Sequence, residues 1–217
     1  MSVIYLVRHA QASFGTDDYD RLSPKGLAQA DILGEHFAAR GIAPNRLIAG
    51  QMLRQRQTLS GLAAKGGLEQ EPVTHTGWDE FSASNITAAY PEQDPLAKTD
   101  TRAFQRLLEK SSARWASGDH DSDYVETFNE FTSRVENALK DAMASLGKGE
   151  SAAVVSSSGA IAWTAAHLLG GGFDLWLRLN RVTVNTGVTK IVGGPQGITL
   201  VSFNDHSHLA NDMVTYR

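Results

Sequence analysis

An arginine and a histidine stand side by side near the start of the chain, directly after the apolar run Val3 to Val7. The planar guanidinium of Arg8 offers a fork of donors that suits phosphate oxygens. A neutral imidazole at His9 can attack phosphorus through a ring nitrogen and hold the phosphoryl group covalently. The pair therefore indicates phosphoryl transfer. An isolated Arg-His pair also occurs in loops as an ion-paired arginine beside a hydrogen-bonding histidine. The surrounding residues must therefore distinguish a catalytic pair from a structural one.

Two longer blocks of sequence extend the pattern around this pair. Residues 20–30 read DRLSPKGLAQA, and residues 52–58 read MLRQRQT, in which Arg54 precedes Thr58 by four positions at the start of a predicted helix. Together with Arg8 and His9, these blocks resemble the histidine phosphatase superfamily, also called phosphoglycerate-mutase-like. The family has a glycine after its histidine, whereas this chain has Ala10.

The resemblance implies roles for individual residues. Arg8 and Arg54 bind the phosphate of the substrate, and we assign Gln11 to the same phosphate site. His9 attacks phosphorus and becomes a phosphohistidine. Glu80, in the segment WDEF, protonates the leaving oxygen. A carboxylic acid can do this where burial raises its pKa.

Two of these assignments have competitors nearby. A dianionic phosphate in a partly dry cleft needs several charge-assisted donors, and a helix N-terminus adds partial positive charge, which independently favours Arg54. Arg56 lies two positions on and therefore on a different face of the helix, which indicates a solvated residue. Asp79 is the alternative to Glu80 as the acid.

The last block departs from the family pattern. After the predicted strand, where the family has Ser-His-Gly-Gly, residues 156–159 read SSSG, so Ser157 occupies the place of a second phosphate-binding histidine. A serine hydroxyl can donate one hydrogen bond to phosphate but is shorter than imidazole and carries no charge. Losing one such donor costs on the order of a hundredfold in rate. We assign Ser157 to the phosphate site. The other histidines are interpreted as structural or surface residues.

Two functions follow as hypotheses. The first is a phosphomonoester phosphatase that acts through a phosphohistidine on His9. The alternative is a catalytically impaired or inactive homologue that binds phosphate esters in a binding or regulatory role, as the serine at position 157 suggests. A phosphoglycerate mutase fits less well, because it must shield its phosphoenzyme from water with one phosphate ligand missing. A serine hydrolase fits poorly, since the Gly-x-Ser-x-Gly elbow is absent.

Composition narrows the remaining classes. The chain has 217 residues, 41% of them hydrophobic, which suits one domain over residues 1–217. A net charge of −4 argues against a nucleic-acid partner. There is no cysteine and no His-Glu-x-x-His cluster, so we predict no metal and no cofactor. The N-terminal apolar run is too short for a signal peptide or membrane span, and we expect a cytoplasmic protein that binds a small phosphorylated substrate or phosphate.

The elements that must position these residues alternate between strand and helix. We predict an α/β fold, a three-layer α/β/α sandwich with a mostly parallel central sheet. The predicted strands cover residues 3–7, 46–49, 72–76, 151–156, 187–192 and 198–203, and the predicted helices cover 24–40, 53–64, 102–116, 128–146 and 159–169. Arg8 and His9 then lie at the carboxyl end of the first strand, where such sheets bind ligands.

One region interrupts the alternation. Residues 81–124 are rich in Pro, Asp, Ser and Thr, and we interpret them as a helical and loop insertion over the site. Lys98, Arg102 and Arg106 in this insertion could meet a second anionic group, but a solvated helix face explains them as well. The segment around Trp176 and Leu177 is either core or a contact in a possible homo-oligomer.

Overall fold

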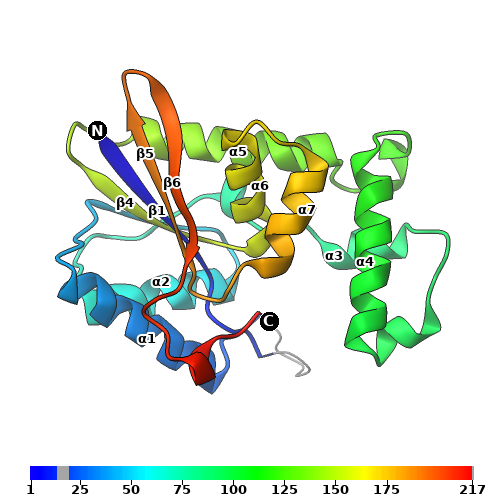
Figure 1. The fold of residues 1–217 in the computed structure, drawn as a ribbon, viewed down its shortest axis with the longest axis horizontal. Helices are drawn as coiled ribbons and strands as arrows, with labels where there is room; N and C mark the ends of the chain where they lie inside the picture. The colour runs from blue at the N-terminus through cyan, green and yellow to red at the C-terminus, as the bar shows by residue number, and fades with distance from the viewer. Residues whose placement is uncertain (14–19, 217) are drawn as a thin grey trace.

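The structure is a computed structural model that describes residues 1–13 and 20–216 (Figure 1). The strands are β1 (Ser2–Arg8), β2 (Arg46–Ala49), β3 (Val73–Thr74), β4 (Ser151–Ser156), β5 (Val188–Gly194) and β6 (Gly197–Asp205). The α-helices are α1 (Pro24–Ala39), α2 (Leu53–Gly66), α3 (Ala83–Ala88), α4 (Thr101–Ala116), α5 (Phe128–Ala144), α6 (Ser158–Leu168) and α7 (Phe173–Val182).

The strands form one mixed sheet in the order β3-β2-β4-β1-β5-β6. β1 pairs parallel to β4, β4 to β2 and β2 to β3, whereas β5 and β6 are antiparallel. This arrangement confirms the predicted mostly parallel sheet. The register between the two central strands pairs Arg8 with Ser156, and the His9 amide donates to the Ser156 carbonyl at 2.8 Å. The carboxyl ends of β1 and β4 therefore lie together.

Helices cover both faces of the sheet, which confirms the predicted sandwich (Figure 1). The side chains of β1 alternate between the two faces. Val7 packs in one core with Leu33 of α1 and Leu59 of α2. Leu6 packs in the other core with Val135 of α5 and Ile161 of α6.

The ends of several elements follow from local sequence. The Ser23 hydroxyl accepts from the Gly26 amide at 3.0 Å and caps α1, with Pro24 at the first helical position, as predicted. At the start of α5, Thr127 and Glu130 form a reciprocal capping box.

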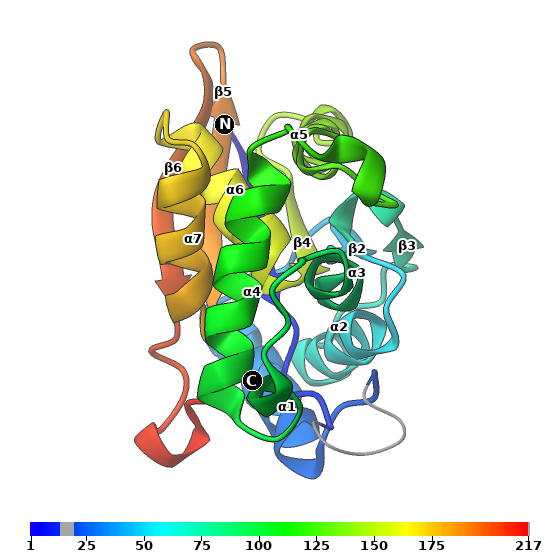
Figure 2. The same ribbon diagram turned by 90° about the vertical axis from the view of Figure 1, so that its right-hand side faces the viewer.

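Two helices were not predicted from the sequence. The short helix α3 has few apolar residues, and α7 buries only Trp176 completely. Trp176 lies in an aromatic cluster with Phe81, Trp115 and Phe131, so the core interpretation of this segment holds. Helix α4 stands beside α7, at one end of the sandwich (Figure 2).

Candidate active site

A cavity of about 1120 Å³ opens at the carboxyl ends of the central strands. Its floor holds Arg8, His9, Gln11, Arg54 and Glu80. Its outer wall comes from residues of α3, α4 and α7 and from residues 215–216. The structure thus brings together five of the six predicted site residues, and parts of the predicted insertion line the same cavity.

His9 is held as a neutral imidazole. Its Nδ1 lies 2.7 Å from the Ala10 carbonyl oxygen, which can only accept, so Nδ1 carries the proton and Nε2 carries the lone pair. The Nε–H of Arg54 donates to that Nε2 at 3.2 Å. Burial, and then the charges of Arg54 and Arg8, hold the pKa of His9 well below its ordinary value. His9 therefore has the protonation state that a nucleophile needs.

Arg54 lies in the first turn of α2 and is 8% exposed. Besides its contact with His9, it forms an ion pair with Asp20, in which Nη1 and Oδ1 are 2.6 Å apart. The other carboxylate oxygen of Asp20 accepts from the Leu53 amide at 2.7 Å. Asp20 therefore fixes both the start of α2 and the direction of the Arg54 side chain.

Arg8 is held by backbone carbonyls from the far end of the chain. Its guanidinium donates to the Thr183 carbonyl and, at 3.0 Å, to the Tyr216 carbonyl. The side-chain amide Nδ2 of Asn185 donates to the His9 carbonyl at 2.9 Å. Arg8 and His9, at the carboxyl end of β1, are thus both held by the segment between α7 and β5.

Glu80 lies at the N-terminus of α6. Its Oε2 accepts from the Gly159 amide at 2.9 Å and from the Ser158 hydroxyl at 3.3 Å. Burial raises the pKa of Glu80, against the opposing effects of the Gly159 amide and Arg54. A Cβ at position 159 would come within 2.3 Å of Glu80 Oε1, so the close approach requires glycine.

Residue Gly159 also connects the acid to the aromatic core. The indole Nε1 of Trp176 donates to the Gly159 carbonyl at 2.9 Å. Trp176 is fully buried. Residue Gly159 therefore links the Glu80 carboxyl group, which its amide binds, to a core tryptophan, which its carbonyl binds.

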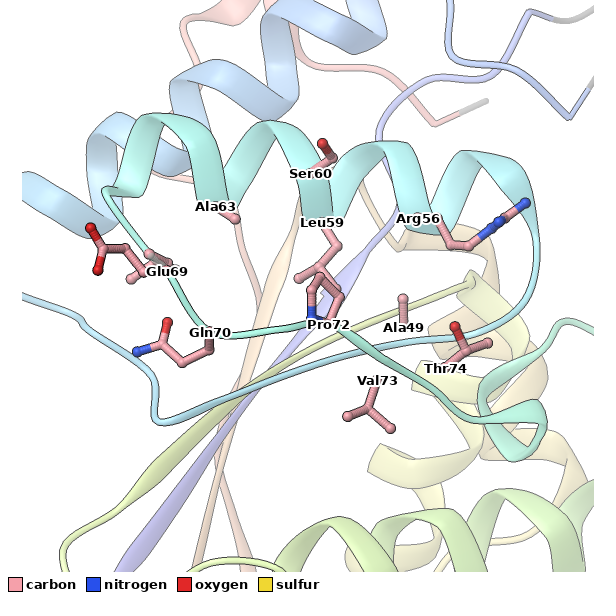
Figure 3. Close-up of a pocket in the computed structure, with 11 residues that line it drawn as sticks. Ala49, Arg56, Leu59, Ser60, Ala63, Glu69, Gln70, Pro72, Val73 and Thr74 are labelled. Carbon is pink, nitrogen blue, oxygen red and sulfur yellow. The ribbon is translucent and has the colours of Figure 1, made fainter.

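The two competing residues lie elsewhere. Asp79 does not line the cavity, and its Oδ1 accepts from the Gln51 amide at 2.6 Å. Arg56 is exposed and borders a separate groove of about 380 Å³ between α2 and the segment around Pro72 (Figure 3). Glu80 and Arg54 line the cavity, whereas Asp79 and Arg56 do not.

Ser157 is the predicted site residue that the structure places outside the cavity lining. It is fully buried, and its hydroxyl accepts from Gln55 Nε2 at 2.9 Å. The neighbouring Ser158 lines the cavity instead. Gln11 lines the cavity, and its Oε1 accepts from the Ser23 hydroxyl at 2.9 Å.

Several supporting residues escaped the sequence analysis. Asp20, Ser158 and Asn185 each contact a predicted site residue. The Thr58 hydroxyl accepts from the Ala10 amide at 2.9 Å. Asp20 and Thr58 lie inside the blocks that carried the resemblance, so their position was a usable signal. For Asn185 the sequence held no such signal.

Metal binding and membrane insertion have no visible basis in residues 1–13 and 20–216. Within these ranges, no group of three or more His, Cys, Asp and Glu side chains could hold a metal ion. Within the same ranges, no helix is both long and apolar enough to cross a bilayer.

Comparisons with known proteins bear on the fold and the family. No curated protein sequence matches the chain. Among solved structures, a phosphoserine phosphatase mutant from Entamoeba histolytica in complex with phosphoserine has a TM-score of 0.69 at 16% identity, covering 97% of this chain and 100% of the other. A phosphoglycerate mutase from Bacillus anthracis has a TM-score of 0.68 at 17% identity, with coverages of 95% and 94%.

A third solved structure is similar to the same extent. A mycobacterial glucosyl-3-phosphoglycerate phosphatase with inorganic phosphate has a TM-score of 0.64 at 18% identity, with coverages of 96% and 99%. At these identities the likeness concerns the fold. The sequence model of the histidine phosphatase superfamily (branch 1) matches residues 4–206. The chain therefore belongs to the histidine phosphatase superfamily.

Proposed function

We propose that this protein is a phosphomonoester phosphatase that works through a phosphohistidine on His9. The observation that carries the proposal is the setting of the His9 ring. Its Nδ1 proton is held by a backbone carbonyl, and its Nε2 accepts from Arg54 in a cavity that Arg8 and the partly buried Glu80 also line. This set provides a nucleophile, an anion site and an acid within one cavity.

The first half of the reaction transfers the phosphoryl group to the enzyme. Arg8 and Arg54 bind the phosphate oxygens, and His9 Nε2 attacks phosphorus in line with the ester oxygen. The bond from Nε2 to phosphorus forms as the bond from phosphorus to the ester oxygen breaks. Glu80 acts in its protonated form, which burial favours by raising its pKa, and gives its proton to the leaving oxygen.

The second half restores the enzyme. The Glu80 carboxylate takes a proton from water, and the water oxygen attacks phosphorus. The bond from phosphorus to Nε2 breaks, which releases inorganic phosphate and returns His9 to its neutral form. Glu80 is then protonated again. No cofactor or metal takes part in these steps.

One observation favours a second candidate, a phosphate-ester-binding homologue without turnover. Among the described cavity-lining residues His9 is the sole histidine, and the Ser157 hydroxyl is directed to Gln55. A site of this kind binds phosphate through Arg8 and Arg54 but stabilises the transition state less. It would bind esters without releasing phosphate.

Phosphate release from a panel of phosphomonoesters separates the two candidates. We expect turnover by the unmodified protein and a loss of at least about a thousandfold in His9→Ala, because the nucleophile is gone. Rapid quenching under alkaline conditions, followed by mass spectrometry of peptides, should place one phosphoryl group on His9. Calorimetric binding of the esters without any phosphate release would instead establish the binding homologue.

A further inference from the structure

The cavity extends well beyond the phosphate end. Its volume of about 1120 Å³ lies just above the range of roughly 300–1,000 Å³ that is usual for small-molecule sites. The phosphate end is confined to the floor around His9. The remaining space must receive the alcohol part of a substrate, so its walls indicate what that alcohol is.

Apolar side chains form much of this outer wall. Phe104 and Leu108 of α4 and Leu177 of α7 line it, and Ala83 of α3 lies at its edge. Leu108 and Leu177 also pack against the main hydrophobic core. Because apolar walls bind apolar groups by excluding water, a bulky and largely apolar alcohol fits this region better than a small hydrophilic one.

The outer wall offers no unneutralised positive charge. Among the described lining residues, Arg181 is the sole cation away from the phosphate end. It is bound through two contacts to Glu109, with Nε to Oε1 at 2.7 Å and Nη2 to Oε2 at 2.6 Å. Burial tends to raise the pKa of Glu109, but hydrogen bonds from Arg181 and Gln105 outweigh it and lower the pKa. The pair stays ionised and mutually satisfied.

The other cations of the insertion lie elsewhere. Lys98, Arg102 and Arg106 are exposed and do not line the cavity. A carboxylate on the substrate would therefore lose water without gaining a cation. Asn180 supplies a neutral group instead. It lines the same wall, and its Oδ1 is buried without a hydrogen-bond partner among the described residues.

From this wall we infer that the substrates are phosphomonoesters of bulky, uncharged and largely apolar alcohols, and that esters of small carboxylate-bearing alcohols are selected against. The Glu109–Arg181 pair, which joins α4 to α7, acts as the discriminating element. The inference rests on the proposed function for its chemistry, and it names the substrate class of that same site.

The test compares two alkyl phosphates that differ in the alcohol. Benzyl phosphate carries an uncharged apolar body, and 3-phosphoglycerate carries a carboxylate. We expect kcat/KM for benzyl phosphate to exceed that for 3-phosphoglycerate by at least about tenfold, the scale set by burying a carboxylate without a partner. An equal or greater kcat/KM for 3-phosphoglycerate would overturn the inference.

Variants test whether the Glu109–Arg181 ion pair causes the preference for benzyl phosphate. In Glu109→Gln the charge of Arg181 is no longer neutralised, so the preference for benzyl phosphate should shrink about tenfold. The double variant Glu109→Gln with Arg181→Gln should restore most of it. The matched control is Arg106→Gln, an exposed arginine on the same helix, which should leave the ratio unchanged. A ratio unaffected by Glu109→Gln also counts against the inference.

Failure of the proposed function is distinguishable from failure of this inference. If neither these two esters nor any other member of the panel is hydrolysed, the phosphatase proposal fails. In that case, the preference is measured as the ratio of the calorimetric dissociation constants of the same two esters. The substrate class would still be supported if the unmodified protein bound benzyl phosphate more tightly than 3-phosphoglycerate and Glu109→Gln reduced this preference. Tighter binding of 3-phosphoglycerate by the unmodified protein would refute it.

Discussion

The pKa values of two titratable side chains in the candidate site are shifted in opposite directions. Burial and two arginines lower the pKa of His9, whereas burial raises the pKa of Glu80. Burial favours the neutral form in both cases. The neutral imidazole is a nucleophile and the neutral carboxyl is an acid, so the same desolvation prepares both residues for their proposed roles.

These shifts predict how activity depends on pH. The proposed reaction needs His9 unprotonated, above its lowered pKa, and Glu80 protonated, below its raised pKa. We therefore expect kcat/KM to fall on the acid side as His9 is protonated and to fall on the alkaline side as Glu80 ionises. In Glu80→Gln, activity should drop about 10²- to 10⁴-fold and the alkaline fall should disappear.

The control for this pH profile is Asp79→Asn. Asp79 also has a raised pKa, chiefly from burial, but it does not line the cavity. An asparagine keeps the oxygen that accepts from the Gln51 amide. An alkaline fall that persists in Glu80→Gln, or that vanishes in Asp79→Asn, would remove Glu80 from the role of the acid.

At the scale of single residues, the sequence predicted which residues line the cavity better than it predicted where their side chains point. Arg8, His9, Arg54 and Glu80 all reach one cavity because each lies next to the end of an element that the pattern could locate. The direction of the Ser157 hydroxyl could not be predicted, since it depends on Gln55, which lies 102 positions away in sequence. Which residue is the acid, and whether Ser157 helps phosphate binding, remain predictions.

At the scale of elements, helix α1 supports the site through its N-cap residue, Ser23. The Ser23 hydroxyl accepts from the Gly26 amide and donates to Gln11 Oε1 at 2.9 Å. It thus caps the helix and holds a cavity-lining side chain at once. A single hydroxyl therefore couples helix stability to the arrangement of the cavity floor.

We expect Ser23→Ala to lower the free energy of unfolding by about 1 kcal/mol, the usual effect of losing an N-cap side chain. Urea denaturation of the variant measures this change. The matched variant is Ser60→Ala, which removes an exposed hydroxyl inside helix α2 and should have little effect. An equal loss in both variants would contradict the capping role.

Elements whose apolar residues recur with one clear period were predictable from the sequence. Short elements and elements with a mixed pattern were not. The strand at residues 46–49 and helix α5 follow directly from their patterns. Helix α7 was missed because Phe173, Leu175, Leu177 and Leu179 recur at every second position, a spacing that resembles a strand although these residues pack against the core from a helix. Strand β3 is shorter than predicted, with both of its residues exposed at the sheet edge.

At the scale of the whole molecule, distant parts of the chain meet behind the site. His208 follows β6, and its ring lies 5.4 Å from that of His36 on α1. Its Nε2 lies 3.1 Å from the hydroxyl of Thr186, whose amide donates to the Arg8 carbonyl. Burial, and then the neighbouring His36, lower the pKa of His208 to about 4, although Asp205 opposes this.

This shift predicts acid sensitivity of the fold. Below its ordinary pKa of 6.5, His208 binds a proton in the unfolded chain but stays neutral in the folded one until about pH 4. Stability should therefore fall as pH drops from 6.5 towards 4, by about 3 kcal/mol at most from this residue. Denaturation series at several pH values should show a smaller slope in His208→Gln.

The control for this slope is His120→Gln, because His120 is exposed in the insertion. That variant should keep the slope of the unmodified protein. His9, also buried and neutral, should keep part of the slope in His208→Gln. A slope identical in all three proteins would show that His208 does not govern acid stability.

The contact between Trp176 and the Gly159 carbonyl has an optical consequence. The amide of the same residue donates to Glu80, so a negative charge on that carboxyl group is held by the residue whose carbonyl the indole binds, and it changes the electric field at the indole. Indole emission responds to its hydrogen bonds and to nearby charge. The fluorescence of a tryptophan buried in the core should thus follow ionisation and occupancy at the cavity floor, without any added label.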